Sequence, residues 1–598
     1  MHGLHHETDG WTRERFRSEA AAWLPDLTRN ASPDVIRASL LDRVNASHFR
    51  TYAEDSELHD LDLVIVRDCA RAWRSLLSPR SERLAEFSFV QALVDSANDV
   101  TRDDLGEGFW AEICHLIRGI EGRERLHDAD SLEVPANLSG RDAALFRSQE
   151  LDRLALDLSS KIAVYEHGLT TEAQQRRAHR ILQIRTALGA SEQQWSDWRW
   201  QLRHIAQTSA QLTRLAHLTD DEKRCIDQAT SARIPFGVTP YYASLFDEEP
   251  SWNADRAIRA QVIPPQNYVD TLCSSEARKA HDFMLETDTS PIDLVTRRYA
   301  GVVIVKPYNT CPQICVYCQR NWEIDRPMAR GALARPTVLD AALAWIADHS
   351  AIHDVLITGG DPLVLSDERL KAILDRLAAI PHVERVRFGT RTPVTLPMRF
   401  TESVSDLISG YAVPGRREIC VVTHVQHPYE VTVDFMNAVN RLRQRAIPVY
   451  NQNVFTFYVS RRFEAVALRR VLRRCGVDPY YTFYPKGKEE TASYRVPIAR
   501  LVQEQKEEAR LLPGLDRTDE PVFNVPGIGK NPLNSWQHRD LISIAPDGAR
   551  IYEFHPWEKK IGGQRTHIAH DVPILLYLRR LRDIGEDPSD YRSIWYYF

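Results

Sequence analysis

The 598-residue sequence contains no run of about 18 apolar residues, so it predicts no transmembrane helix. Its first residues, MHGLHHETDGW, lack the charged-then-apolar pattern of a signal peptide. Nine cysteines are too few for a disulfide framework, which indicates a reducing compartment. A net charge of −6 disfavours a nucleic-acid-binding protein, which normally carries a basic excess. We therefore expect a cytoplasmic protein without a membrane or nucleic-acid partner.

The composition is that of an ordinary globular protein, with 43% hydrophobic and 26% charged residues. Single cores stop growing near about 250–300 residues, so we expect two or three units. In residues 1–190, apolar residues recur at three- and four-residue steps, which predicts helices. We therefore predict an added N-terminal all-α domain at 1–190, for assembly or partner docking, and a helical bridge at 191–290.

From Val302 onward, short apolar runs alternate with helical patterns. Parallel strands joined by right-handed helical crossovers form a barrel or part of one. The fold class is therefore α/β, with a partial (β/α)6 barrel over 291–515 and a C-terminal segment over 516–598. The predicted strands are 302–306, 354–358, 385–389, 418–424, 448–454 and 479–484.

A polar cluster lies at or just beyond the end of each predicted strand. Ligands of such barrels lie over the carboxyl ends of the strands, so these clusters predict one site on a single rim. In chain order they are Cys311, Cys315 and Cys318, then Gly359–Asp361, Thr390–Arg391, His424, Gln452 and Lys486.

The three cysteines have the spacing C-x3-C-x2-C and follow the first predicted strand of the barrel. Three thiolates from one loop can hold three irons of a [4Fe-4S] cluster, which leaves the fourth iron open to a small molecule. Three unrelated cysteines or half of a zinc site are the alternatives. A zinc site needs a fourth Cys or His at matching spacing, and none lies nearby.

With this spacing the chain resembles the radical S-adenosylmethionine (SAM) enzymes, and among them the lysine 2,3-aminomutase family. Tyr299 and Arg320 fall at family positions on either side of the cysteines. The segments ITGGDPLVLSDERL (357–370) and VRFGTRTPVTLPMRFT (386–401) are similar to the family almost word for word. The resemblance runs from about residue 192 to about residue 557, so the first 190 residues lie outside it.

The resemblance implies which residues surround SAM. In isolation, a Gly-Gly-Asp is usually a turn, and a histidine at a strand end usually bonds to the backbone. In the family, the Gly-Gly-Asp segment binds the amino group of SAM, other strand-end residues surround the same ligand, and a tyrosine between the cysteines lies near the adenine. The matching residues here are Gly359, Gly360, Asp361, Arg391, His424, Gln452 and Tyr317.

A second motif lies far downstream in FNVPGIGKNPL (523–533), where Lys530 follows a Pro-Gly-Ile-Gly turn. In isolation, such a lysine would be a solvated loop charge. The motif resembles the family's glycine-rich segment, whose lysine holds pyridoxal 5′-phosphate (PLP) as a Schiff base, although the family has four glycines where this chain is one residue shorter. Arg298 and Tyr299 match residues beside the PLP ring. An amine nucleophile must be deprotonated, so we expect Lys530 to be desolvated and near other cations.

The resemblance implies a 2,3-aminomutase, an isomerase of amino acids. A reduced cluster splits SAM, the resulting radical takes a hydrogen from the substrate's β-carbon, and the α-amino group moves to that carbon. A flavodoxin- or ferredoxin-type electron donor is therefore expected. The non-enzyme alternative is an inactive scaffold or regulatory protein. Joint retention of the three cysteines with Arg320 and Lys530 argues against it.

Two positions bear on the substrate. Arg320 would bind the α-carboxylate through its planar, two-pronged donor group. Lysine-specific members of the family hold the substrate's ammonium with two aspartates, and the matching positions here are Lys486 and Asn524. An ammonium about 4 Å from Lys486 would cost about 4 kcal/mol at an effective dielectric of about 20. We therefore expect L-glutamate to become β-glutamate; L-lysine is the alternative, and a pocket-facing Glu489 would favour it.

The C-terminal region departs from the family in one respect. Lysine 2,3-aminomutases often carry a C-terminal cysteine cluster for zinc at a subunit interface, whereas no cysteine follows Cys475 here. We therefore expect no zinc. A homo-oligomer is still expected, and the aromatic tail DYRSIWYYF either docks on a neighbouring chain or covers the barrel.

Overall fold

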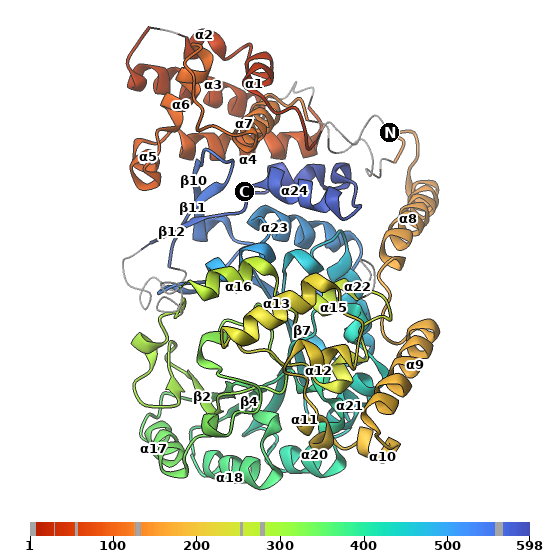
Figure 1. The fold of residues 1–598 in the computed structure, drawn as a ribbon. Coiled ribbons are helices and arrows are strands. Elements are labelled where there is room, and N and C mark those ends of the chain that lie inside the picture. The colour runs from red at the N-terminus through yellow and green to blue at the C-terminus, as the bar shows by residue number, and fades with distance from the viewer. Residues whose placement is uncertain are drawn as a thin grey trace.

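The computed structural model describes residues 7–28, 30–53, 58–124, 126, 132, 134–250, 255–274, 282–556 and 566–598. It has a large curled sheet of nine strands and a small sheet of three (Figure 1). Within the described residues, no helix has the length and apolar character needed to cross a membrane.

The large sheet is an open half-barrel whose strands follow one another in chain order, from β1 to β9. Strands β2 to β8 are parallel, and β1 and β9 add antiparallel edges. The strands of this sheet are β1 (Val295–Thr296), β2 (Val302–Tyr308), β3 (Asp354–Gly359), β4 (Arg385–Gly389), β5 (Glu418–Thr423), β6 (Val449–Val454), β7 (Asp478–Phe483), β8 (Glu520–Val525) and β9 (Gly529–Pro532).

The predicted α/β class is confirmed, and the six predicted strands correspond to β2–β7 within one or two residues. The sheet has one more parallel strand than predicted, because β8 pairs with β7 in parallel. The turn after β8 leads directly into β9, so the glycine-rich motif that we expected as a loop forms a β-hairpin. Pro521 and Asn524 inside β8 are residues that strands usually avoid, although β6 and β7 contain similar residues.

Helices cover the outer face of the half-barrel between successive strands (Figure 1). Several begin with a cap that the sequence specifies: Ser366 accepts a hydrogen bond from the Arg369 amide, and Pro336 occupies the first turn of its helix. These helices are α17 (Pro336–Ala347), α18 (Asp367–Ala378), α19 (Thr392–Thr395), α20 (Glu402–Ser409), α21 (Val433–Arg443), α22 (Glu464–Arg474) and α23 (Ile498–Glu507).

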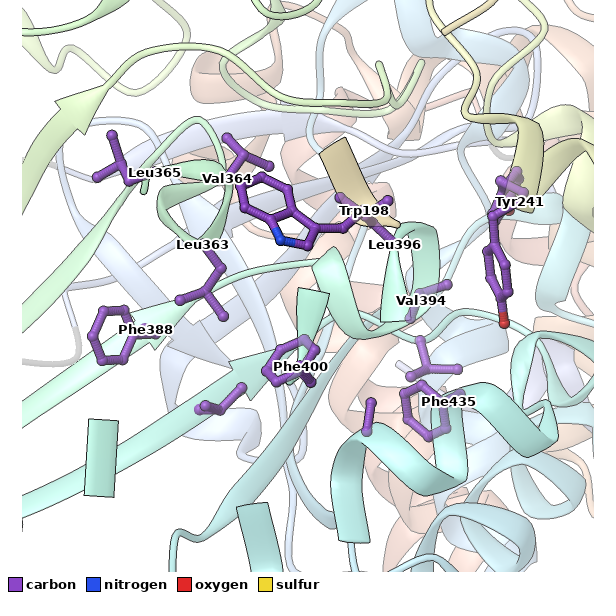
Figure 2. Close-up of a cluster of buried hydrophobic side chains, with 14 of the residues drawn as sticks. Trp198, Tyr241, Leu363, Val364, Leu365, Phe388, Val394, Leu396, Phe400 and Phe435 are labelled. Atoms are coloured by element: carbon purple, nitrogen blue, oxygen red, sulfur yellow. The ribbon is translucent and has the colours of Figure 1, made fainter. Parts of the chain in front are cut away.

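The main core lies between this sheet and the surrounding helices. Figure 2 shows part of it, where Trp198, Phe388, Phe400 and Phe435 gather. Trp198 comes from the predicted bridge, so this part of the bridge packs on the barrel. Its helices are α10 (Glu192–Trp195), α11 (Trp198–Arg203), α12 (Ser209–Thr213), α13 (Asp220–Ser231), α14 (Pro240–Ala243), α15 (Arg256–Ala260) and α16 (Gln266–Cys273).

The first 190 residues contain only helices and loops among the residues described there. Two of the helices, α8 and α9, run along the side of the barrel, whereas α1–α7 gather at one end of the molecule (Figure 1). The helices are α1 (Arg13–Glu19), α2 (Leu24–Leu27), α3 (Pro33–Arg50), α4 (Asp60–Leu76), α5 (Pro79–Ala85), α6 (Phe89–Ala97), α7 (Glu107–Ile120), α8 (Gly140–Ala163) and α9 (Thr171–Leu188).

Helices α1–α7 share one hydrophobic core with the C-terminal part of the chain. That part contains β10 (Arg539–Ile544), β11 (Arg550–Phe554) and β12 (His567–His570), which form the small sheet, followed by α24 (Ile574–Asp583). The aromatic tail belongs to the same core, because Trp595 stacks on His115 of α7 at 4.4 Å. The tail thus packs within its own chain. The division at residue 190 stays a prediction.

One buried ion pair joins the two ends of the chain. Arg550 of β11 donates to Glu112 of α7 at 3.0 Å, and each side chain is 1% exposed. Glu112→Ala would leave the Arg550 charge buried without its partner, which typically costs about 3–5 kcal/mol. We expect a loss of that size in the free energy of unfolding, measured by urea denaturation. Glu150→Ala removes an exposed partner of Arg153 and should change little; equal effects would contradict a shared core.

Candidate active site

The three cysteines lie on the loop that follows β2, at the carboxyl edge of the half-barrel. Burial raises the pKa of Cys311, and the negative charges of Asp361, Cys318 and Cys315 raise it further. Each thiol is therefore close enough to influence the others. Two nitrogen donors point at sulfur: the Arg320 amide lies 3.3 Å from Cys318 Sγ, and the Arg391 guanidinium donates to Cys315 Sγ.

A close backbone contact fixes this loop against the end of β3. The Asp361 amide donates to the Thr310 carbonyl at 2.9 Å. A Cβ added at Gly360 would meet the backbone of Thr310 at 2.0 Å, so only glycine fits there. Gly359 has φ = +103°, a conformation that also favours glycine. The two glycines were predicted to bind SAM. The structure gives them a second role, because they let the cysteine loop approach β3.

Asp361 is buried, and three donors already occupy its carboxylate. Thr390 Oγ1 donates at 2.6 Å, the Arg391 amide at 2.8 Å and the Leu363 amide at 3.1 Å. The side chain therefore ties the end of β3 to the end of β4.

Arg391 is the centre of a buried network on the far side of the cysteines. Its guanidinium donates to Glu430 Oε1 at 2.6 Å and also to Gln261 Oε1. The hydroxyl of Tyr317 donates to the same Gln261 oxygen at 3.2 Å. Two residues predicted to surround SAM thus meet at Gln261, a bridge residue that was not among the predicted site residues.

His424 and Gln452 lie at the carboxyl ends of β5 and β6. Burial and the positive charge of Arg391 lower the pKa of His424 to about 4, and a bond to the Gln452 backbone acts in the opposite direction. The imidazole is therefore neutral at neutral pH and can accept a hydrogen bond.

Lys530 and Asn524 are opposite residues of the β8–β9 hairpin, so their side chains share one face. The Lys530 amide donates to the Tyr299 hydroxyl at 3.3 Å, and Lys530 Nζ lies 4.4 Å from the centre of the Tyr481 ring. Burial and the charge of Arg387 lower the pKa of Lys530 to about 8. The side chain is thus desolvated, as a nucleophilic amine requires.

Lys486 follows β7 and belongs to the same group of charges. Burial first, then the charge of Arg298, lowers the pKa of Lys486 well below its usual value, and the charges of Lys530 and Lys488 act in the same direction. The structure therefore brings the predicted substrate lysine, the predicted PLP lysine and Arg298 into electrostatic contact.

Arg320 is buried and is already paired. Its two terminal nitrogens contact Glu286 and Glu323, and Lys306 lies 3.6 Å and 3.7 Å from the same two carboxylates. Lys306, Glu286 and Glu323 were not among the predicted site residues. A lone acidic residue in a loop resembles any solvated charge, whereas Lys306 is a charged residue inside the apolar strand β2, which is a signal that could have identified it.

Lys488 connects the cysteine loop to the lysine-bearing loop after β7. Its Nζ donates to Asn321 Oδ1 at 2.8 Å and lies 2.5 Å from Glu490 Oε1. Glu489, the residue that would have favoured a basic substrate, is exposed. Neither carboxylate of this loop is therefore available to hold a substrate ammonium.

Comparison with known proteins gives a consistent picture, although no protein-family model matches the chain. An uncharacterized KamA family protein of Methanocaldococcus jannaschii is 41% identical over 562 residues, which covers 90% of each chain. A glutamate 2,3-aminomutase of Clostridioides difficile is 30% identical over 432 residues, covering 71% of this chain and 96% of that protein. An L-lysine 2,3-aminomutase of Bacillus subtilis is 32% identical over 372 residues, covering 61% and 73%.

The chain belongs to the lysine 2,3-aminomutase family. The match to the Methanocaldococcus protein leaves only a tenth of this chain outside, so it includes most of the first 190 residues. These N-terminal residues are therefore shared with at least one member of the family.

Gly360→Ala tests the contact that positions the cysteines. The added methyl group would overlap the Thr310 backbone, and such overpacking typically costs about 1–3 kcal/mol. We expect lower thermal stability and less iron bound per chain after anaerobic reconstitution. The matched control is Gly331→Ala, because a Cβ there meets no atom within 4 Å. Equal iron content in the two variants would show that this contact does not position the cysteine loop.

Proposed function

We propose that the protein is a radical SAM, PLP-dependent 2,3-aminomutase that converts L-glutamate to β-glutamate. Its membership of the family makes it an isomerase. One observation supports the choice of L-glutamate as the substrate. Lys486 lies within electrostatic reach of Lys530, while Asn524 faces Lys530 across the hairpin. The side-chain end of the substrate would therefore meet a cation and an amide, which suit a carboxylate.

The residues present fit the three cofactors. Cys311, Cys315 and Cys318 offer three thiolates, and the donors to Cys315 and Cys318 are of the kind that tune iron–sulfur clusters. Beside them, Gln313 and Thr423 have buried polar side-chain atoms without a hydrogen-bond partner in the described part of the chain, which suits a polar ligand such as SAM. Cluster and SAM together would supply one-electron chemistry at the rim of the barrel.

PLP fits at Lys530. The pKa of about 8 leaves part of the amine unprotonated at neutral pH, as attack on the PLP aldehyde requires. Tyr299 and Tyr481 flank the side chain and limit its access to water. When bound, PLP would supply a conjugated system that delocalises an unpaired electron.

The chain's own residues would orient the substrate between these cofactors. Arg320 suits the α-carboxylate, because a guanidinium binds a carboxylate in two-pronged geometry. Lys486 and Asn524 would hold the side-chain carboxylate. Fixing both ends of a five-carbon dicarboxylate leaves little freedom at its β-carbon, where the reaction occurs.

A one-electron donor of the flavodoxin or ferredoxin type, a homo-oligomeric assembly and a cytoplasmic location complete the proposal. A cluster held by the three cysteines would need a one-electron reductant to become active, and small electron-transfer proteins supply one in a reducing compartment.

Lys486→Asp tests the substrate. The change replaces the cation with a carboxylate that repels the substrate's own, so we expect kcat/KM for glutamate to fall by about 100-fold or more, equivalent to about 2.8 kcal/mol. The measurement is amino-acid analysis after anaerobic incubation with SAM, PLP and dithionite, with lysine offered in parallel. The control is Glu489→Gln, which changes an exposed charge of the same loop. Equal rates for the wild type and Lys486→Asp would remove Lys486 from the pocket, and β-lysine formation would favour the alternative substrate.

The pKa of Lys530 makes a separate prediction for PLP uptake. Only the neutral amine attacks, and its fraction rises about tenfold per pH unit below the pKa and then levels off. The rate of PLP binding, followed by visible absorbance, should therefore rise up to about pH 8 and flatten above it. Lys530→Ala should abolish the absorbance change, whereas Lys371→Ala, an exposed lysine, should not. A profile that still rises steeply at pH 10 would contradict a lowered pKa.

A further inference from the structure

A short segment before β1, Met284–Thr289, covers the cations of the proposed substrate site. The Met284 carbonyl accepts from Arg298 at 2.8 Å, and its sulfur lies 3.2 Å from Lys486 Nζ. Glu286 contacts Arg320 and lies 3.6 Å from Lys306 Nζ. One segment thus touches four positive side chains that surround the proposed substrate.

Glu286 is the only acidic residue of this segment whose side chain reaches those cations in the described structure. It is 5% exposed, and its negative charge raises the pKa values of both Lys486 and Arg298 against the effect of burial. Glu286 thus pairs with Arg320 and acts electrostatically on Lys486, and these are the two groups proposed to bind the two carboxylates of the substrate.

A substrate carboxylate cannot use Arg320 in full while Glu286 remains there. Both terminal nitrogens of Arg320 are engaged, one by Glu286 and one by Glu323. Two-pronged binding of a carboxylate needs both terminal nitrogens of Arg320, or one of them together with Nε. Nε is buried and has no hydrogen-bond partner among the described residues. A second carboxylate beside Glu286 would also be repelled by it.

The backbone has an uncommon conformation at one position inside this segment and at another between the segment and β1. Leu285 and Leu294 have φ = +52° and +66°, in the left-handed region that non-glycine residues seldom adopt. At Leu285 the chain turns so that Leu285 is 46% exposed while Glu286 points inward. Asp282 holds the turn by accepting from the Glu286 amide at 2.7 Å. Strain of this kind is common at functional sites.

We propose that Glu286 holds the place of the substrate's α-carboxylate at Arg320 and is exchanged for that carboxylate when substrate binds. The inference rests on the proposed function, because it takes Arg320 and Lys486 as the substrate's partners. Glu286 keeps the buried cations paired when no substrate is present and makes every anionic ligand compete with it. Glu323 remains on the other nitrogen and holds the guanidinium in place.

Glu286→Gln separates this exchange from a purely structural role, because the two give opposite results. Removal of the competing charge should tighten binding of glutarate, a five-carbon dicarboxylate without an amino group, by about tenfold. That factor equals about 1.4 kcal/mol. Calorimetric titration of the reconstituted holoenzyme measures the affinity for glutarate. KM for glutamate should fall by a similar factor, with a smaller change in kcat. If Glu286 only positions Arg320, glutarate binding should weaken and KM should rise.

Two further variants complete the test. Glu323→Gln removes the other carboxylate of the same cluster and should weaken glutarate binding, because Arg320 loses the group that holds it. Glu286→Asp keeps the charge on a shorter side chain, so its affinity for glutarate should lie between those of the wild type and Glu286→Gln. If Glu286→Gln folds poorly, Glu286→Asp still tests the exchange against the wild type. Unchanged or weaker glutarate binding in both Glu286 variants would overturn the proposal.

Failure of the exchange at Glu286 can be distinguished from failure of glutamate as the proposed substrate. If the wild type converted lysine and not glutamate, the proposed function would fail, and the exchange would be judged by KM for lysine, whose α-carboxylate also needs Arg320. A fall in that KM with Glu286→Gln would support the exchange, and a rise would overturn it.

Discussion

The arrangement of the active site depends on a backbone contact that leaves no room for a side chain. Thr310, which precedes the first cysteine, lies against Gly360, where a Cβ would come within 2.0 Å of its carbonyl oxygen. The Asp361 amide then bonds to that carbonyl, and the Asp361 carboxylate bonds to the start of the loop after β4. One glycine thus fixes the cysteine loop to β3, and the next residue fixes β3 to β4. The thiols therefore keep their position relative to the carboxyl ends of the strands, where the other reactive groups lie.

The second half of the site depends on the hairpin that closes the edge of the half-barrel. Strand β8 continues the parallel sheet, and β9 reverses along it and brings Lys530 opposite Asn524. A lysine on a loop could point in many directions, whereas a lysine on a paired strand has one choice of face. Because this face looks onto Tyr299 and Tyr481, the amine is desolvated and its pKa falls to about 8. The electrostatic property that the chemistry needs is thus a consequence of strand register.

The sequence predicted the parts of this structure that local patterns encode. The predicted positions of β2–β7 agree with the structure within two residues, since short strand-like segments alternate with helical patterns there. Strand β8 was missed, because its pairing with β7 is a long-range contact that local patterns do not encode. The residues Cys311, Arg320 and Lys530 were recognised through motifs. Glu286 and Lys306 have no motif, and only the folded chain shows that they are buried against Arg320. Sequence therefore identified the groups with distinctive spacing and missed the charges that balance them.

That balance limits how the site can operate. Arg298, Lys306, Arg320 and Lys486 would be costly to bury together without counter-charges, so Glu286 and Glu323 accompany them. Glu286 and Glu323 are each shared by Arg320 and Lys306, so the basic side chains of this group outnumber these two carboxylates. The same pairing means that a ligand must replace contacts that already exist and cannot simply fill vacant ones. The net binding free energy of such a ligand is the difference between the ion pairs that it forms and those that it replaces. Selectivity in this site therefore depends on how well the ligand's carboxylates fit as much as on their charge.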